Sequence, residues 1–145
     1  MKQAVLKTTT VGDAAVDGLL GGVVAGIAMV IYLVVVNLFA GEGVAVLNRF
    51  DPNAASPMVG VLLHLAVSGV YGAVFGIGWK YARRLDVPTW LGGIVFGVAL
   101  FLLAEFVLLP TSQSPLTKIP FVHFGIGHVI YGLVIGWIVG RNLSK

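Results

Sequence analysis

Five side chains that could bind a ligand lie inside otherwise apolar stretches of this chain. They are His64, Tyr71, Glu105, His128 and Tyr131. An ionisable group in hydrocarbon is costly, so it usually faces a polar partner or serves a function. These five residues are therefore the candidate cofactor-binding residues.

The two histidines and the glutamate share a depth within their stretches. His64 is seven residues after a proline, His128 is eight after one, and Glu105 is five before one. On helices that rise about 1.5 Å per residue, all three would lie roughly 7–12 Å from the same surface. We therefore expect Glu105 to form a hydrogen bond with a histidine.

This cluster leaves four interpretations open. Two histidines at one depth could ligate the iron of haem b from both sides. Histidines with a carboxylate could hold a divalent metal. A Glu–His pair could instead relay protons or orient a quinone headgroup. The fourth interpretation is a structural Glu–His hydrogen bond. No standard zinc motif is present, and the prediction is no metal and no firmly assigned cofactor, with bound lipids expected.

No other pattern points to catalysis. The sequence has no serine elbow, phosphate loop, HExxH motif or pair of acids, and it has no cysteine. Thiol catalysis and thiolate metal sites are excluded by that last count. The chain is therefore predicted to be no enzyme, with no catalytic residues.

The elements that carry these groups are predicted to be membrane helices. The chain has 145 residues, of which 58% are hydrophobic and 10% are charged, and its mean hydropathy is +0.99. Soluble domains carry about 25% charged residues. Four stretches of 20 to 23 residues are nearly free of charge, and each is long enough to cross a membrane. They are 18–40, 58–79, 90–109 and 121–140.

The basic residues predict the orientation. Seven of the nine lie on one side if the chain starts in the cytoplasm, and only Arg49 and Lys118 lie on the other. The positive-inside rule then places both termini in the cytoplasm. Trp79, Trp90 and Trp137 would lie at the same interface. The expected location is the bacterial cytoplasmic (inner) membrane.

Two phrases recur along the chain. LGGVVAGIA at 20–28 matches LGGIVFGVA at 91–99, and VYGAVFG at 70–76 matches IYGLVIG at 130–136. This order predicts a duplicated helical hairpin with both copies in the same direction. The expected fold is one all-α transmembrane domain over 1–145, with parallel-repeat hairpins at about 13–84 and 88–141.

Small residues recur every four positions on all four predicted helices. Such stripes let helix backbones approach closely in lipid. The stripes pack either within one compact bundle or against helices of another protein. The predicted packing residues are Gly18, Gly22, Gly26, Ser68, Gly72, Gly76, Gly93, Gly97, Gly132, Gly136 and Gly140.

Several short motifs together resemble small bacterial inner-membrane proteins of the YagU-like group. They are Gly21–Gly22, His64 with Tyr71–Gly72, Leu109–Pro110, and His128 with Tyr131–Gly132. The resemblance implies a four-helix membrane protein and brings no activity and no site residues with it.

The expected function is a non-catalytic accessory subunit of a larger bacterial membrane complex for respiratory or photosynthetic electron transfer. One alternative is a small homo-oligomeric transporter or channel. Another is a haem- or quinone-binding subunit that uses His64, His128 and Glu105. The expected partners are membrane lipids and other transmembrane subunits. Nucleic acid is not expected, because an anionic leaflet accounts for the net charge of +3.

Overall fold

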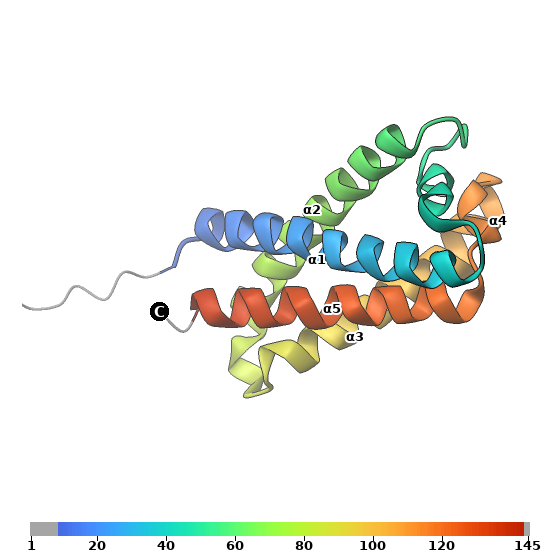
Figure 1. The fold of residues 1–145 in the computed structure, drawn as a ribbon. Helices are drawn as coiled ribbons and strands as arrows, with labels where there is room; N and C mark the ends of the chain where they lie inside the picture. The colour runs from blue at the N-terminus through green and yellow to red at the C-terminus, as the bar shows by residue number, and fades with distance from the viewer. Residues whose placement is uncertain (1–8, 144–145) are drawn as a thin grey trace, which may run out of the picture.

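The computed structural model describes residues 9–143, which form helices joined by short loops and contain no strand. Four long helices run back and forth: α1 (Val11–Phe39), α2 (Pro57–Ala82), α3 (Thr89–Leu103) and α5 (Phe121–Leu143) (Figure 1). Together with the short elements that extend α2 and α3, all four are long and apolar enough to cross a membrane. The predicted all-α fold with four membrane-length helices is confirmed.

Local sequence signals set where the first two helices begin. The hydroxyl of Thr10 accepts a hydrogen bond from the Asp13 N–H, and the Asp13 carboxylate accepts one from the Thr10 N–H. This capping box satisfies two backbone donors at the start of α1. At the start of α2, the Ser56 hydroxyl accepts a hydrogen bond from the Val59 N–H. Pro57 takes the first helical position, where its missing N–H costs nothing.

The two connections at the far end of the bundle contain short helices. η1 (Gly43–Phe50) lies between α1 and α2, and η4 (Pro115–Lys118) precedes α5. The Arg49 guanidinium joins them, since it donates to the Lys118 carbonyl oxygen at 3.0 Å and pairs with the Glu42 carboxylate. The two connections are thus held against each other.

Asp51 fixes the path of the chain from η1 into α2. Its carboxylate accepts hydrogen bonds from the N–H groups of Asn53, Ala55 and Ser56, at 3.0 to 3.2 Å. The Asn53 N–H lowers the pKa of this carboxyl most, burial opposes that change, and the Ser56 and Ala55 N–H groups lower it further. The ionised form is therefore favoured in the folded loop.

A pH dependence follows from this lowered pKa. The stabilisation is fully present above the unfolded pKa of about 3.9 and is lost as the pH falls through the lower folded value. We expect the midpoint temperature of unfolding, measured in detergent, to decrease when the pH is lowered below about 4. An Asp51→Asn variant should be less stable than the wild type at pH 7, and it should lose less stability than the wild type on acidification. Equal pH profiles for both proteins would show that Asp51 does not stabilise this loop.

Two central helices and two outer helices make up the bundle. α1 and α5 lie side by side, α2 packs on α1, and α3 packs on α5. α2 and α3 touch little, because they diverge toward the end that holds η1 and α4 (Leu109–Ser112) (Figure 1). This divergence leaves space between them in that half of the molecule.

The small-residue stripes form the two hairpin interfaces. A methyl group added at Gly72 would overlap the Gly18 carbonyl and lie 2.6 Å from the Gly22 Cα. In the second hairpin, one added at Gly132 would overlap the Gly93 carbonyl and lie 3.0 Å from the Ile94 Cα. Backbones this close leave no room for side chains. The stripes therefore pack within the bundle, which was the first of the two alternatives.

The two hairpins differ in register by one helical turn. The repeated phrases align Gly22 with Gly93 and Gly72 with Gly132. In the structure, however, Gly76 faces Gly18 whereas its counterpart Gly136 faces Gly93. Gly93 thus takes the packing position of Gly18, four residues before Gly22. The duplication stays a prediction, because the interfaces share their chemistry but not the register that the sequence match implies.

The third helix does not end at Pro110. A π-helical segment, η3 (Ala104–Leu108), follows α3 and leads into α4, which contains Pro110 and ends at Ser112. Proline has no N–H and clashes with the carbonyl four residues earlier. The wider π turn just before it accommodates this mismatch, so the helix continues one turn further than the apolar stretch predicts.

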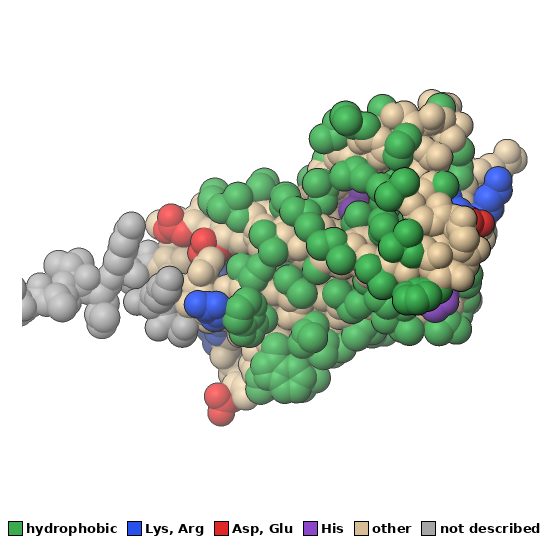
Figure 2. Space-filling view, viewed as in Figure 1, with side chains coloured by type: hydrophobic (Ala, Val, Ile, Leu, Met, Phe, Trp, Pro, Cys, Tyr) green, Lys and Arg blue, Asp and Glu red, His purple; other side chains and the backbone are tan. Residues whose placement is uncertain are grey.

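The surface separates apolar from charged side chains. Apolar side chains cover the middle of the visible face, and charged ones lie at its two ends (Figure 2). More than thirty large apolar side chains of the described residues are exposed, among them Leu20, Leu62 and Val95. An apolar belt between two charged ends is what a multi-pass membrane protein presents to lipid.

Candidate functional site

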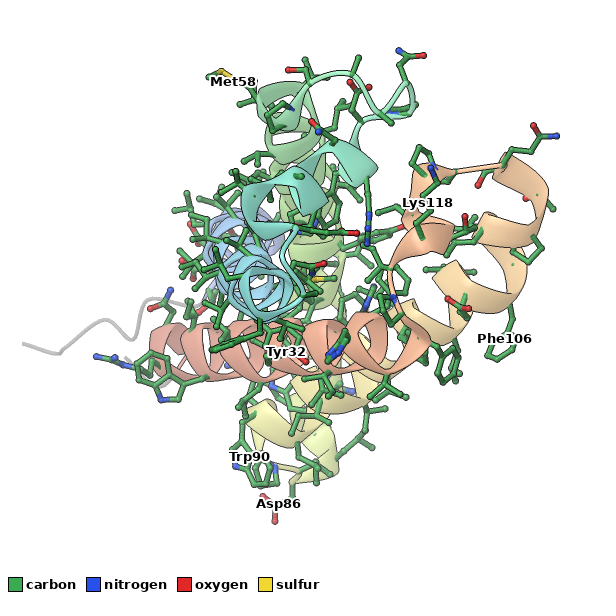
Figure 3. All side chains as sticks on the ribbon, turned by 45° about the vertical axis from the view of Figure 1, so that its right-hand side comes forward. Tyr32, Met58, Asp86, Trp90, Phe106 and Lys118 are labelled. Carbon is green, nitrogen blue, oxygen red and sulfur yellow. The ribbon has the colours of Figure 1, made fainter. Side chains whose placement is uncertain are left out.

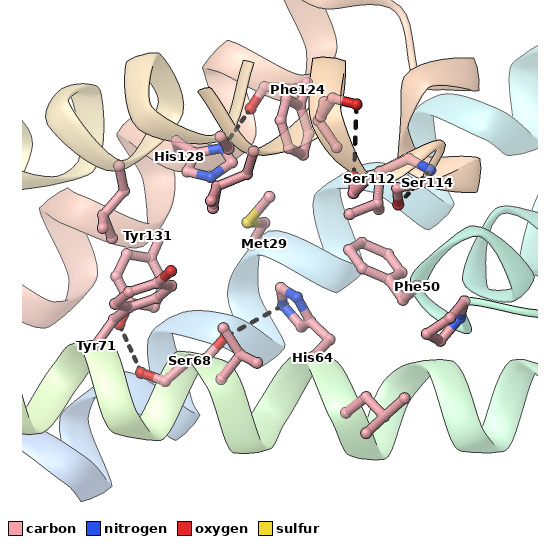
Figure 4. A pocket seen from close by; sticks show the side chains of 18 residues that line it. Met29, Phe50, His64, Ser68, Tyr71, Ser112, Ser114, Phe124, His128 and Tyr131 are labelled. Carbon is pink, nitrogen blue, oxygen red and sulfur yellow. Dashed lines mark hydrogen bonds between the residues drawn. The ribbon is translucent and has the colours of Figure 1, made fainter. Parts of the chain in front are cut away.

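A cavity of about 480 Å³ lies between α2 and α3 where the two helices diverge. Its walls come from every long helix, and η1, α4 and η4 close the end. Most of the lining is apolar. The polar lining residues are His64, Ser68, Tyr71, Ser112, Ser114, His128 and Tyr131 (Figure 4). Four of the five candidate ligand-binding residues therefore line one cavity.

His128 is held by its own helix, α5. Its Nδ1 lies 2.9 Å from the carbonyl oxygen of Phe124, one turn earlier. The Phe124 ring packs edge-on against the imidazole, with 4.6 Å between ring centres. Because a carbonyl oxygen only accepts, Nδ1 carries the proton and Nε2 is left as the acceptor. Figure 4 shows the imidazole between its helix and the cavity.

His64 is held by the first helix from across the hairpin. Its Nε2 donates to the Gly26 carbonyl oxygen at 3.1 Å, which links α2 to α1. The Ser68 hydroxyl lies 3.5 Å from the same nitrogen. Phe50 of η1 packs on the ring, with 4.5 Å between ring centres. His64 thus faces the cavity from α2, opposite His128 on α5 (Figure 4).

The two tyrosines, which occupy matching positions in the repeated phrases, have different roles. The Tyr131 hydroxyl is buried and donates to the Ser68 carbonyl oxygen at 2.7 Å, so it joins α5 to α2 at the inner end of the cavity. Within the described residues, the Tyr71 hydroxyl forms no hydrogen bond. It is therefore available to a bound molecule as both donor and acceptor.

Glu105 is not part of this cavity, and its predicted hydrogen bond with a histidine is not formed in the described structure. The prediction rested on the depth that Glu105 shares with the two histidines, and depth does not determine where a side chain points. The side of this helix that lines the cavity instead carries Leu100, Ala104 and Leu108, which are spaced by four residues. Glu105 is half-buried beside them, and its neighbour Phe106 points away from the bundle (Figure 3).

The third histidine lies outside the cavity. His123 Nδ1 is 3.0 Å from the Tyr32 hydroxyl, which connects α5 to α1 on another side. Sequence reasoning also missed Met29, Phe50 and Phe124 as lining residues. Met29 lies three residues after Gly26, and no signal in the sequence brings Phe50 of η1 onto a histidine two turns into α2.

The cavity opens sideways toward the surface that lipid would cover. Leu63 and Val67 of α2 and Leu108 of η3 all line it, and they are 42%, 50% and 43% exposed. A molecule dissolved in the bilayer could therefore enter between α2 and η3 without crossing water. In the described part of the chain, no three His, Asp or Glu side chains gather as a metal site.

The site combines an apolar interior with a few polar groups aimed inward, as small-molecule sites do. Comparisons with family models, curated proteins and solved structures find no match for this chain, so the resemblance to the YagU-like group stays a prediction.

Proposed function

We propose that this protein is a multi-pass membrane protein that binds a lipophilic molecule of the quinone class in the cavity between α2 and the α3–α5 hairpin. The observation that supports it best is one cavity, open toward the apolar surface, with His64 and His128 on opposing walls. A quinone carries polar oxygens at opposite ends of a flat ring. It needs such a site: apolar walls, aromatic neighbours and two polar anchors.

The chemistry of the lining favours a quinone over haem b. No Lys or Arg side chain is among the described residues that line the cavity. The carboxylates of a haem would therefore meet apolar groups, and burying an unpaired carboxylate is expensive. A quinone headgroup is uncharged and avoids that cost. Phe50 and Phe124, each packed on a histidine, would flank its ring.

The proposal also includes the orientation of the protein in the membrane. Lys80, Arg83, Arg84 and Arg141 lie where α2 and α5 end, at the end of the bundle where α1 begins (Figure 1). The positive-inside rule then favours cytoplasmic termini in the bacterial inner membrane. The cavity would lie in the half of the membrane away from the cytoplasm.

The test is a titration of purified protein with decylubiquinol and with decylubiquinone, each at a fixed detergent concentration. The proposal predicts saturable binding of one molecule per chain. Uptake that rises linearly, to the same extent as in detergent micelles without protein, would contradict it. An absorption spectrum of the same preparation, with and without added haem, separates the haem alternative, which requires a Soret band.

The accessory-subunit hypothesis is supported by a different observation. α3 has only Gly93, Gly97 and Phe101 buried, so most of its apolar surface is free to meet lipid or another subunit. The stripes of small residues no longer support it, because they pair inside the bundle. Gentle solubilisation followed by identification of co-migrating chains tests this second function. Migration as a small homo-oligomer would favour the transporter alternative.

A further inference from the structure

Which ring nitrogen of His64 and of His128 carries the hydrogen bears on whether the oxidised or the reduced form of a quinone fits the cavity. In the neutral ring, one nitrogen carries hydrogen and the other accepts. His128 uses its N–H for the Phe124 carbonyl and His64 uses its N–H for the Gly26 carbonyl. Each ring therefore offers a lone pair, from Nε2 of His128 and from Nδ1 of His64.

The other polar lining groups do not offset this bias. The Tyr131 hydroxyl donates to Ser68, and the Ser112 hydroxyl lies 3.5 Å from the Leu109 carbonyl oxygen. The hydroxyls of Ser68, Tyr71 and Ser114 can each donate or accept, so they serve a quinol and a quinone alike. No Asp, Glu, Lys or Arg lines the cavity in the described residues. The groups that distinguish a donor from an acceptor are thus the two imidazoles.

An oxidised quinone fits this arrangement poorly. Its two carbonyl oxygens only accept, so each would face a nitrogen lone pair and stay without a hydrogen bond. The reduced, dihydroxy form carries an O–H at each end of the ring and can donate to both nitrogens. A molecule with a single hydroxyl would leave one acceptor unpaired.

Resting on the function proposed above, we infer that the cavity binds the quinol in preference to the quinone, with one hydroxyl donating to His64 Nδ1 and the other to His128 Nε2. Two neutral hydrogen bonds that only the quinol can form predict a preference of about tenfold or more. The site is thereby selective for the redox state of its occupant.

The test compares three probes on the wild-type protein: decylubiquinol, decylubiquinone and the dimethyl ether of decylubiquinol. The expected order is tight binding of the quinol, with the quinone and the ether at least about tenfold weaker. The quinone differs from the quinol by only two hydrogen atoms, so that pair tests hydrogen bonding at nearly constant size. The ether also cannot donate, but its two added methyl groups make it larger, so it serves as a second probe without donors.

Two variants assign the preference to residues. His64→Phe and His128→Phe should each reduce the ratio of quinol to quinone affinity several-fold, and the double variant should abolish it. His123→Phe, outside the cavity, should keep the wild-type ratio. Equal affinities of the wild type for quinol, quinone and ether would overturn the inference and leave the proposed function standing. Absence of saturable binding for all three probes would overturn both.

Discussion

Replacing Gly72 by alanine is expected to destabilise the bundle by about 3 kcal/mol, at the upper end of what overpacking usually costs. The new methyl group would overlap the Gly18 carbonyl and lie 2.6 Å from the Gly22 Cα. Both are backbone atoms, so no side chain can rotate away and the two helices must separate. Separation also weakens the neighbouring contacts between Gly76 and Ala14. The thermal midpoint in detergent measures the loss.

The matched control is Gly78→Ala on the same helix. A methyl group there meets no atom within 4 Å. Alanine favours a helix over glycine by up to about 1 kcal/mol, so this variant should be as stable as the wild type or slightly more stable. If both variants melt together with the wild type, α1 and α2 do not pack through their glycines.

Replacing Ala104 by phenylalanine is expected to lower the affinity for decylubiquinol at least tenfold. Ala104 lines the cavity from η3 and has a small side chain, so a benzyl group would occupy space that the ring of the quinol needs. The bundle should keep its stability, because the new ring fills a void instead of displacing packed atoms. Binding and melting are measured on the same preparation.

Val107→Phe serves as the control for this substitution. Val107 belongs to the same π-helical segment, is 54% exposed and does not line the cavity. The affinity of the Val107→Phe variant for decylubiquinol should equal that of the wild type. A similar loss in both variants would mean that the aromatic side chains act on η3 itself and not by filling the cavity.

The sequence contained the main features of the fold because membrane helices are specified locally. Length and lack of charge identified four spans, since a backbone in lipid must satisfy its own hydrogen bonds. The hairpin partners followed from the order of the helices along the chain. The four-residue spacing also predicted which faces of the helices pack closely.

The site was predicted only in part, because it depends on geometry between helices. His64 and His128 share a cavity as their depths suggested, yet Glu105 does not join them. Depth along a helix does not determine which of its sides lines the cavity. That side carries Leu100, Ala104 and Leu108, which do not include Glu105. The one-turn shift in register between the two hairpins could not be predicted either, because glycines repeated every four residues fit more than one register.

The position of the bound molecule tests the central claim most directly. A photoreactive azido-quinone, illuminated with the purified protein, should label peptides of α2 and α5 around His64 and His128. An excess of decylubiquinol should prevent this labelling. Labelling spread along lipid-facing positions such as Val70 and Val74, and unaffected by decylubiquinol, would show that the cavity is not the binding site.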